Sequence, residues 1–294
     1  GDSHTYSLVS GSGSTDNASF AISGSNLNTA ASFDFESQGS YNIRIRTADS
    51  GGLYYEEAFT IYVIDINESP IITSNGGGST ANISITENST AVTTVTSTDQ
   101  DAGSSASYSI VGGNDQSDFT INSSSGVLSF SSAPDFENPQ DSNSDNSYVV
   151  TVQVSDGSNT DSQTMTVTVI DVNDAPTNIS LSSTSVNENI GSGTTVGALS
   201  STDVDAGDSH TYSLVSGSGS THNSSFSISG SNLKTAASFD FESQGSYSIR
   251  IRTTDSGTGA LSYEKAFTIY VIDVNDAPSN ISLSSTSVNE NQSS

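Results

Sequence analysis

The sequence has no cysteine and no tryptophan, one methionine, and only six basic residues. Without cysteine, neither a disulfide framework nor thiol chemistry is available to this chain. Its apolar stretches are all far too short to span a bilayer. These absences exclude disulfide-rich scaffolds, cysteine-dependent enzymes and membrane insertion by this part of the protein.

The basic residues are outnumbered by 33 acidic residues, and the formal net charge is -27. Such a charge opposes binding to nucleic acid or to an anionic membrane, and it favours the binding of cations. An acidic chain rich in serine and glycine could also be disordered. The apolar residues, however, lie in short alternating runs that recur along the chain, and this pattern favours a folded protein.

Internal repetition determines the predicted domain organisation. Residues 1–62 and 207–270 are nearly identical, and the sequence NISLSSTSVNEN occurs at both 178–189 and 280–291. The period is about 100 residues, which is the size of an ordinary domain. We therefore predict four segments: a partial repeat at 1–68 without its first two strands, complete repeats at 69–174 and 175–276, and the start of a fourth at 277–294.

The repeats have the pattern of half-buried strands. Tyr247, Ile249 and Ile251, for example, alternate with polar residues, as expected for one buried face of a strand. Arg250 and Arg252 alternate with them and are expected on the solvated outer face, where they offset acidic neighbours. About seven such strands in each repeat of ~100 residues predict an all-β fold, with tandem Greek-key β-sandwich domains arranged end to end.

The acidic residues recur at the same five places of each repeat. Two of these places carry Asp-x-Asp or Asp-x-Glu, and residues i and i+2 of an extended chain point the same way, roughly 7 Å apart. Several carboxylates would then face one space, and their mutual repulsion calls for a cation. In the third repeat the five places hold Glu188, Asp203 with Asp205, Asp240 with Glu242, Asp255, and Asp273 with Asn275 and Asp276.

Calcium is the cation that suits these oxygen ligands best. It accepts six to eight oxygens from carboxylates, amides and carbonyls in a flexible geometry, whereas magnesium prefers a tight octahedron with retained water. Zinc would favour cysteine or histidine ligands, which are absent or rare here. The loop Asp141–Asp145 of the second repeat has a similar alternation of acids, and for it we favour a solvated loop over an additional ion site.

These motifs, in this order, resemble the cadherin repeat over the whole chain. The linker Asp171–Pro176 is one residue shorter than the usual animal version and is similar to that of large bacterial surface adhesins. A disulfide-free extracellular protein also fits a bacterial source better than an animal one. The resemblance implies calcium ions between consecutive domains, an extracellular or cell-surface location, and no enzymatic activity.

The resemblance also implies which residues hold the ions at each junction. Between the first and second repeats these are Asp34, Glu36, Asp65, Asn67, Glu68, Asp99, Asp101 and Asp156. Between the second and third repeats they are Glu87, Asp135, Glu137, Asp171, Asn173, Asp174, Asp203, Asp205 and Asp255. At the end of the third repeat they are Glu188, Asp240, Glu242, Asp273, Asn275 and Asp276. Glu68 replaces the Asp found at the two later positions, so some distortion of that site is expected.

The leading functional hypothesis is a set of spacer or adhesion repeats that become rigid when calcium binds. The first alternative is a module that binds surface polysaccharide or another ligand, with Tyr54, Tyr55 and Tyr263 as candidate contact residues. The second alternative is self-association, in which other copies of the chain form a filament by strand addition. No histidine lies in a repeated arrangement with serine and aspartate, which argues against catalysis.

Overall fold

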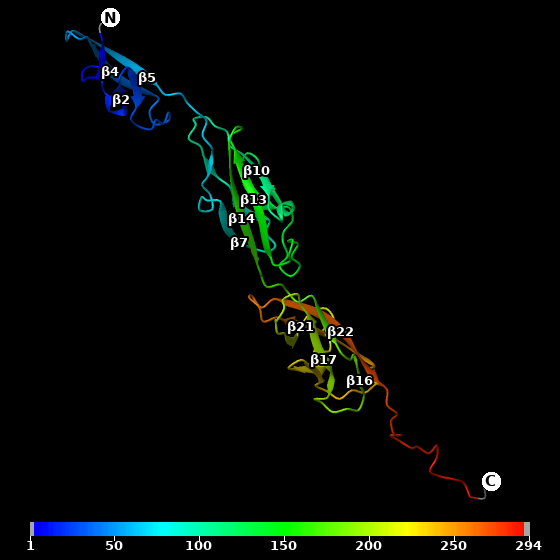
Figure 1. Ribbon diagram of the computed structural model, residues 1–294. Helices are drawn as coiled ribbons and strands as arrows, with labels where there is room; N and C mark the ends of the chain where they lie inside the picture. Colours follow the sequence, from blue (N-terminus) through cyan, green and yellow to red (C-terminus); the bar gives the residue numbers. More distant parts are fainter. Residues whose placement is uncertain (1–2, 291–294) are drawn as a thin grey trace. The chain divides into compact units, whose positions relative to one another are not determined.

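The structure is a computed structural model that describes residues 3–290 (Figure 1). It contains two compact units, residues 1–171 and residues 172–294. The first unit contains the first and second repeats, and the second unit contains the third repeat. Residues 1–2 of the predicted first segment and 291–294 of the predicted fourth segment lie outside the described residues.

The first repeat consists of β1 (Thr5–Leu8), 3-10 helix η1 (Asn17–Ser19), β2 (Phe20–Ser23), β3 (Asn26–Thr29), β4 (Ser40–Ala48) and β5 (Tyr54–Tyr62). Strand β4 is the centre of an antiparallel sheet with β1 and β5 on either side, while β2 and β3 form a separate hairpin. Phe20 of the hairpin joins Tyr41 and Ile43 of β4 in a small core.

The second repeat consists of β6 (Ile71–Ile72), β7 (Thr80–Thr86), β8 (Ala91–Thr94), β9 (Ser97–Thr98), β10 (Ser107–Gly112), 3-10 helix η2 (Gln116–Asp118), β11 (Phe119–Ile121), β12 (Val127–Phe130), β13 (Ser147–Ser155) and β14 (Thr160–Ile170). One sheet has the order β10-β13-β14-β7, and the other has the order β11-β12-β8. The pair β7 and β14 is parallel, and the other pairs in these two sheets are antiparallel.

The third repeat consists of β15 (Asn178–Leu181), β16 (Ser185–Asn187), β17 (Thr195–Thr202), β18 (Thr211–Leu214), 3-10 helix η3 (Asn223–Ser225), β19 (Phe226–Ser229), β20 (Asn232–Thr235), β21 (Ser246–Thr254) and β22 (Ser262–Ile272). Its two sheets have the orders β15-β17-β20-β19 and β16-β22-β21-β18. As in the second repeat, the last strand pairs in parallel with an early one, here β16.

The alternation of apolar and polar residues produces these sandwiches. In the third repeat, Ile179 and Leu233 of one sheet pack in the same core as Ile249, Ile251 and Ile269 of the other, and all five side chains are completely buried. Full burial of a side chain of this size stabilises a fold by about 1.5–3 kcal/mol. The predicted all-β class with tandem sandwich domains is confirmed. Among the described residues, no helix is long and apolar enough to cross a membrane.

The arginine residues lie on the outer face of the central strands, as expected. In the third repeat, Arg250 Nε lies 2.8 Å from Glu264 Oε2, and Arg252 lies 2.6 Å from Glu264 Oε1. The guanidinium groups of Arg250 and then Arg252 lower the pKa of Glu264 from its ordinary value. Glu56 is held in the same way by Arg46 and Arg44 in the first repeat.

A further feature shared by the repeats is an acceptor side chain before each 3-10 helix. Asp16 Oδ2 accepts the N–H of Asn42 at 2.7 Å, and an aspartate in the second repeat plays the same role. In the third repeat the position is occupied by His222, whose Nδ1 accepts the N–H of Ser248 at 2.9 Å. An imidazole nitrogen therefore replaces a carboxylate oxygen in the same backbone contact.

Acid should weaken the third repeat through Glu264. Because the pKa of Glu264 is lowered in the folded state, the pair contributes stability above the unfolded pKa and loses it as the pH falls through the folded pKa. We compare the unfolding midpoints of the unmodified chain and of Glu264→Gln in chelator as the pH falls below 4.5, the ordinary pKa of glutamate. The midpoint of the unmodified chain should fall more steeply than the midpoint of the variant. Parallel pH profiles would contradict this prediction.

The backbone contact of His222 can be tested by substitution. His222→Asp should retain the stability of the third repeat at neutral pH, because Asp16 makes the same contact in the first repeat. His222→Leu leaves the Ser248 N–H without this acceptor and should lower the free energy of unfolding by about 1–3 kcal/mol. Urea unfolding measures both changes. If the two variants were equally stable, the acceptor role would be wrong.

Candidate metal centres

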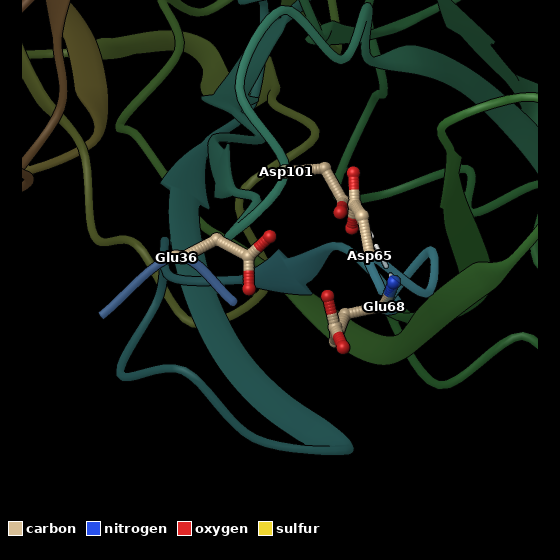
Figure 2. A group of neighbouring side chains, drawn as sticks. All are labelled: Glu36, Asp65, Glu68 and Asp101. Atoms are coloured by element: carbon tan, nitrogen blue, oxygen red, sulfur yellow. Dashed lines mark hydrogen bonds between the residues drawn. The ribbon is translucent and has the colours of Figure 1, made fainter. Parts of the chain in front are cut away.

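Four carboxylates gather where the chain passes from the first repeat to the second (Figure 2). Glu36 lies between β3 and β4, Asp65 and Glu68 follow β5, and Asp101 lies in the turn after β9. One oxygen of each residue lies within 4.8 Å of one oxygen of every other. Glu36 belongs to the first repeat and Asp101 to the second. This group, which we call the linker group, therefore contains carboxylates from both repeats.

The electrostatics of the linker group favour a bound cation. Burial raises the pKa of Glu68, and the negative charges of Glu36 and Asp101 raise it further. Glu68 Oε2 is buried and has no hydrogen-bond partner. The second repeat contains no lysine or arginine that could balance these charges. A divalent ion would supply both the missing partner and the missing charge.

A second group of carboxylates adjoins the linker group and shares Asp101 with it. Asp99, Asp101 and Asp156 each place one oxygen within 4.8 Å of the others. The Asn67 amide donates to Asp156 Oδ2 at 2.9 Å. The backbone N–H of Asn159 and then the Asn67 amide lower the pKa of Asp156. The group is therefore built to keep Asp156 ionised.

The end of the second repeat has its own acidic group. Glu87 follows β7 directly and is only 3% exposed. Its Oε2 accepts the N–H of Phe136 at 2.9 Å. Oxygens of Glu87, Glu137 and Asp171 lie within 4.8 Å of one another. The buried glutamate is thus held by the backbone with its charge next to two further carboxylates.

The end of the third repeat has the same arrangement. Glu188 follows β16, is 2% exposed, and accepts the N–H groups of Val274 at 2.7 Å and Phe241 at 2.8 Å. These two donors, with Val274 first, lower the pKa of Glu188. Oxygens of Glu188, Glu242 and Asp276 lie within 4.8 Å of one another. The second and third repeats therefore share this geometry, which argues against a chance cluster.

The start of the third repeat holds a group that we call the entry group. It consists of Asp203, Asp208 and Asp255, whose oxygens lie within 4.8 Å of one another. Asp255 is 5% exposed, and its Oδ2 accepts from the Asn173 amide at 3.3 Å. His210 Nε2 lies 2.8 Å from Asp203 Oδ2.

Not every predicted ligand points into a group. In each Asp-x-Glu motif the aspartate accepts backbone N–H groups of the residues that follow, while the glutamate joins the carboxylate group. This differs from the expectation that both members face one space, because the short aspartate side chain closes a turn on its own backbone. The aspartates are Asp34, Asp135 and Asp240, and their partners in the groups are Glu36, Glu137 and Glu242.

The remaining predicted ligands lie beside the groups. Asp205 is not in the entry group, and its Oδ2 accepts the N–H of Asp174 at 2.7 Å, as Asp101 Oδ2 accepts the N–H of Glu68 at 2.9 Å. The Asn275 amide donates to the carbonyl of Asp276 at 3.3 Å, and Asp273 lies outside the group of Glu188. Glu68, which replaces an aspartate, still reaches the linker group.

Three residues of these sites were not predicted from the sequence. Gln100 Nε2 donates to Asp34 Oδ1 at 3.0 Å, and Asn159 Nδ2 donates to the carbonyls of Asn67 and Glu68 at 2.9 and 3.1 Å. Neutral amides leave no charge pattern in a sequence, so no sequence signal identified Gln100 and Asn159 as parts of these sites. The third is Asp208, an acid three residues after Asp205 that the five-place pattern does not include.

The Asp141 loop is exposed at residues 142–145, as expected for a solvated loop, but Asp141 itself is buried. Asp141 is only 5% exposed, and its carboxylate accepts the N–H groups of Asp145 at 2.9 Å and Asn146 at 3.3 Å. Its oxygens therefore hold the loop together.

The donor set of the groups fits calcium. All members are carboxylates or asparagines, and three buried carboxylate oxygens in the described residues have no hydrogen-bond partner: Glu68 Oε2, Asp99 Oδ2 and Asp208 Oδ2. A hard cation that accepts many oxygens satisfies such atoms, whereas a zinc site would need nitrogen or sulfur ligands.

Comparison with known proteins agrees with this fold. The chain is 30% identical over 265 residues to human Protocadherin Fat 1, which covers 85% of this chain and 6% of that protein. It is 29% identical over 181 residues to mouse Protocadherin Fat 2, with 58% of this chain and 4% of that protein covered. The chain thus spans only a small part of these relatives. They are animal proteins and do not support the predicted bacterial type.

Solved structures of cadherin repeats have the same fold. The Protocadherin GammaB4 extracellular domain matches 94% of this chain and 43% of its own, with a TM-score of 0.59 and 24% identity. Human CDH23 EC21-23 matches 92% of this chain and 88% of its own, with a TM-score of 0.62 and 19% identity. The Cadherin domain description matches residues 81–170 and 182–272, which is more than half of the sequence. The chain therefore belongs to the cadherin domain family.

Proposed function

We propose that this chain is a set of calcium-binding cadherin repeats from an extracellular or cell-surface protein, and that calcium makes the junctions between the repeats rigid. The observation that carries this proposal is the linker group, in which carboxylates of two successive repeats and of the segment between them face one another without a basic partner. Membership of a family of adhesion domains supports an adhesive or spacing role and indicates no catalytic activity.

The proposed mechanism follows from the charges. Without calcium, like charges within a few ångströms repel, so the first repeat is free to move relative to the second, to which Asn67 and Glu68 stay hydrogen-bonded. When calcium binds, Glu36 and Asp101 become ligands of a common ion, and separation of the repeats would break those bonds. Ions that bind only the assembled junction stabilise it by mass action.

The proposal includes the ligand sets predicted for the three junctions. It also includes the segment boundaries 1–68, 69–174, 175–276 and 277–294. The groups around Glu87 and Glu188 support it, because each lies at the end of a repeat and has the same backbone donors. The bacterial adhesin type, which was inferred from the short linker, stays a prediction. The partner in adhesion is proposed to be another copy of the chain or a surface polysaccharide.

The alternative of a polysaccharide-binding module depends on exposed aromatic residues. Tyr54 and Tyr55 are 63% and 65% exposed in the first repeat. Tyr263 pairs with Thr253 as Tyr55 pairs with Thr47, but it packs partly buried against the third core. Because the aromatic surface is not repeated, we favour the calcium-dependent spacer over this alternative.

Calcium binding at the linker group can be tested with Asp101→Asn. Asp101 belongs to two groups, so loss of its charge should weaken the calcium-induced rise in stability while leaving stability in chelator unchanged or higher. A site filled at a calcium concentration of 100 times its Kd stabilises the fold by about 2.7 kcal/mol. Thermal unfolding of the whole chain in calcium and in chelator measures this difference.

A matched control is Glu57→Gln, which removes one negative charge from an exposed position of β5 outside all the carboxylate groups. We expect its response to calcium to equal that of the unmodified chain. An Asp101→Asn variant that gained as much stability from calcium as this control would contradict the role of Asp101. A lack of any calcium response in the unmodified chain would contradict the proposed function itself.

A further inference from the structure

The third repeat differs from the second in one turn of its entry group. In the second repeat the turn reads Asp99-Gln-Asp101-Ala-Gly-Ser104, and in the third it reads Asp203-Val-Asp205-Ala-Gly-Asp208. The backbone is closed in the same way in both, since the N–H of the last residue donates to the carbonyl of the second aspartate at 3.4 Å. A serine in one repeat and an aspartate in the other therefore occupy equivalent positions.

The side chain of Asp208 faces the other acids of the entry group. One of its oxygens lies within 4.8 Å of oxygens of Asp203 and Asp255. Its Oδ2 is buried and has no hydrogen-bond partner, while Oδ1 accepts from the Ser256 hydroxyl at 3.0 Å. Ser256 thus orients the carboxylate and leaves one oxygen for a ligand. The second repeat has Gly157 after its equivalent aspartate, so it lacks this orienting hydroxyl as well.

The backbone around the entry group leaves room for this carboxylate. A Cβ atom at Gly257 would overlap Asn173 Oδ1 and would lie 2.8 Å from Asp208 Oδ2. Glycine at this position therefore lets the amide of Asn173 and the carboxylate of Asp208 approach the same space. The other charged or titratable neighbour with a defined contact is His210, which lies against Asp203.

We propose that Asp208 is an additional calcium ligand, and that it makes the entry group of the third repeat bind calcium more tightly than the equivalent group of the second repeat. The proposal rests on the proposed function, since it adds a ligand to one of those sites. Calcium affinity increases with the number of charged oxygen ligands, and the turn of the third repeat carries one more carboxylate, that of Asp208, than the turn of the second repeat. The two complete repeats then fill with calcium at different concentrations.

The direct test is a calcium titration of the whole chain by calorimetry. Asp208→Asn keeps an oxygen that can accept from Ser256 but removes the charge, and Asp208→Ser reproduces the second repeat. Both should weaken calcium binding at one class of sites by about tenfold or more, a change within the range over which ligand number tunes calcium sites. Glu57→Gln again controls for net charge and should leave every site unchanged.

A purely structural role of Asp208 is distinguished by Ser256→Ala and by measurements in chelator. If Asp208 only held the turn, Ser256→Ala would lower the unfolding midpoint in chelator as much as Asp208→Ser does. If Asp208 is a ligand that lies among like charges, Asp208→Asn should keep or raise the unfolding midpoint in chelator, because it removes repulsion. The same variant should lower the calcium affinity in the titration.

A gain of affinity provides the converse test. Ser104→Asp in the second repeat places a carboxylate at the equivalent position of the same turn. We expect it to tighten the calcium binding of the group with Asp99, Asp101 and Asp156. Unchanged affinity in the Asp208 variants, with calcium bound by the unmodified chain, would overturn the role of Asp208 alone. Absence of calcium binding in the unmodified chain would overturn the proposed function and this inference together.

Discussion

Uncompensated repulsion between carboxylates is the constraint on which the function of this chain depends. The linker group places four acidic side chains within 4.8 Å of one another, and the second repeat has no basic residue to offset them. The arginines of the neighbouring repeats are occupied by Glu56 and Glu264 on the outer faces of the sandwiches. In the proposed function, a cation balances the acidic groups at the ends of the repeats, and the stability of each junction is tied to the concentration of that cation.

The sandwiches hold these charges in place through backbone donors. Glu87 and Glu188 are almost completely buried next to N–H groups, and the aspartates of the Asp-x-Glu motifs close turns on their own backbone. These contacts lie at the ends of strands whose apolar faces form the cores. The energy that orders the carboxylates thus comes from the packing of the sandwiches, and in the proposed function calcium joins groups that are already oriented.

The sequence was sufficient for the fold class because period-2 alternation and internal repetition are strong signals, as Ile249 and Ile251 illustrate. It was also sufficient to find most carboxylates of the groups, since acids at repeated positions are visible in a sequence. It did not separate aspartates that close turns, such as Asp240, from those that face a group, because both have the same spacing. Gln100 and Asn159 were missed because neutral amides carry no charge pattern, and Asp208 because it lies outside the repeated motif.

The central claim is that calcium converts flexible junctions into rigid ones. Small-angle X-ray scattering of the whole chain, in millimolar calcium and again in chelator, tests this most directly. We expect the scattering of one stiff particle in calcium and of a broad ensemble of arrangements in chelator, with each sandwich still folded. Identical scattering in both conditions, with calcium bound, would contradict it, because the carboxylate groups would then have no control over how the repeats are joined.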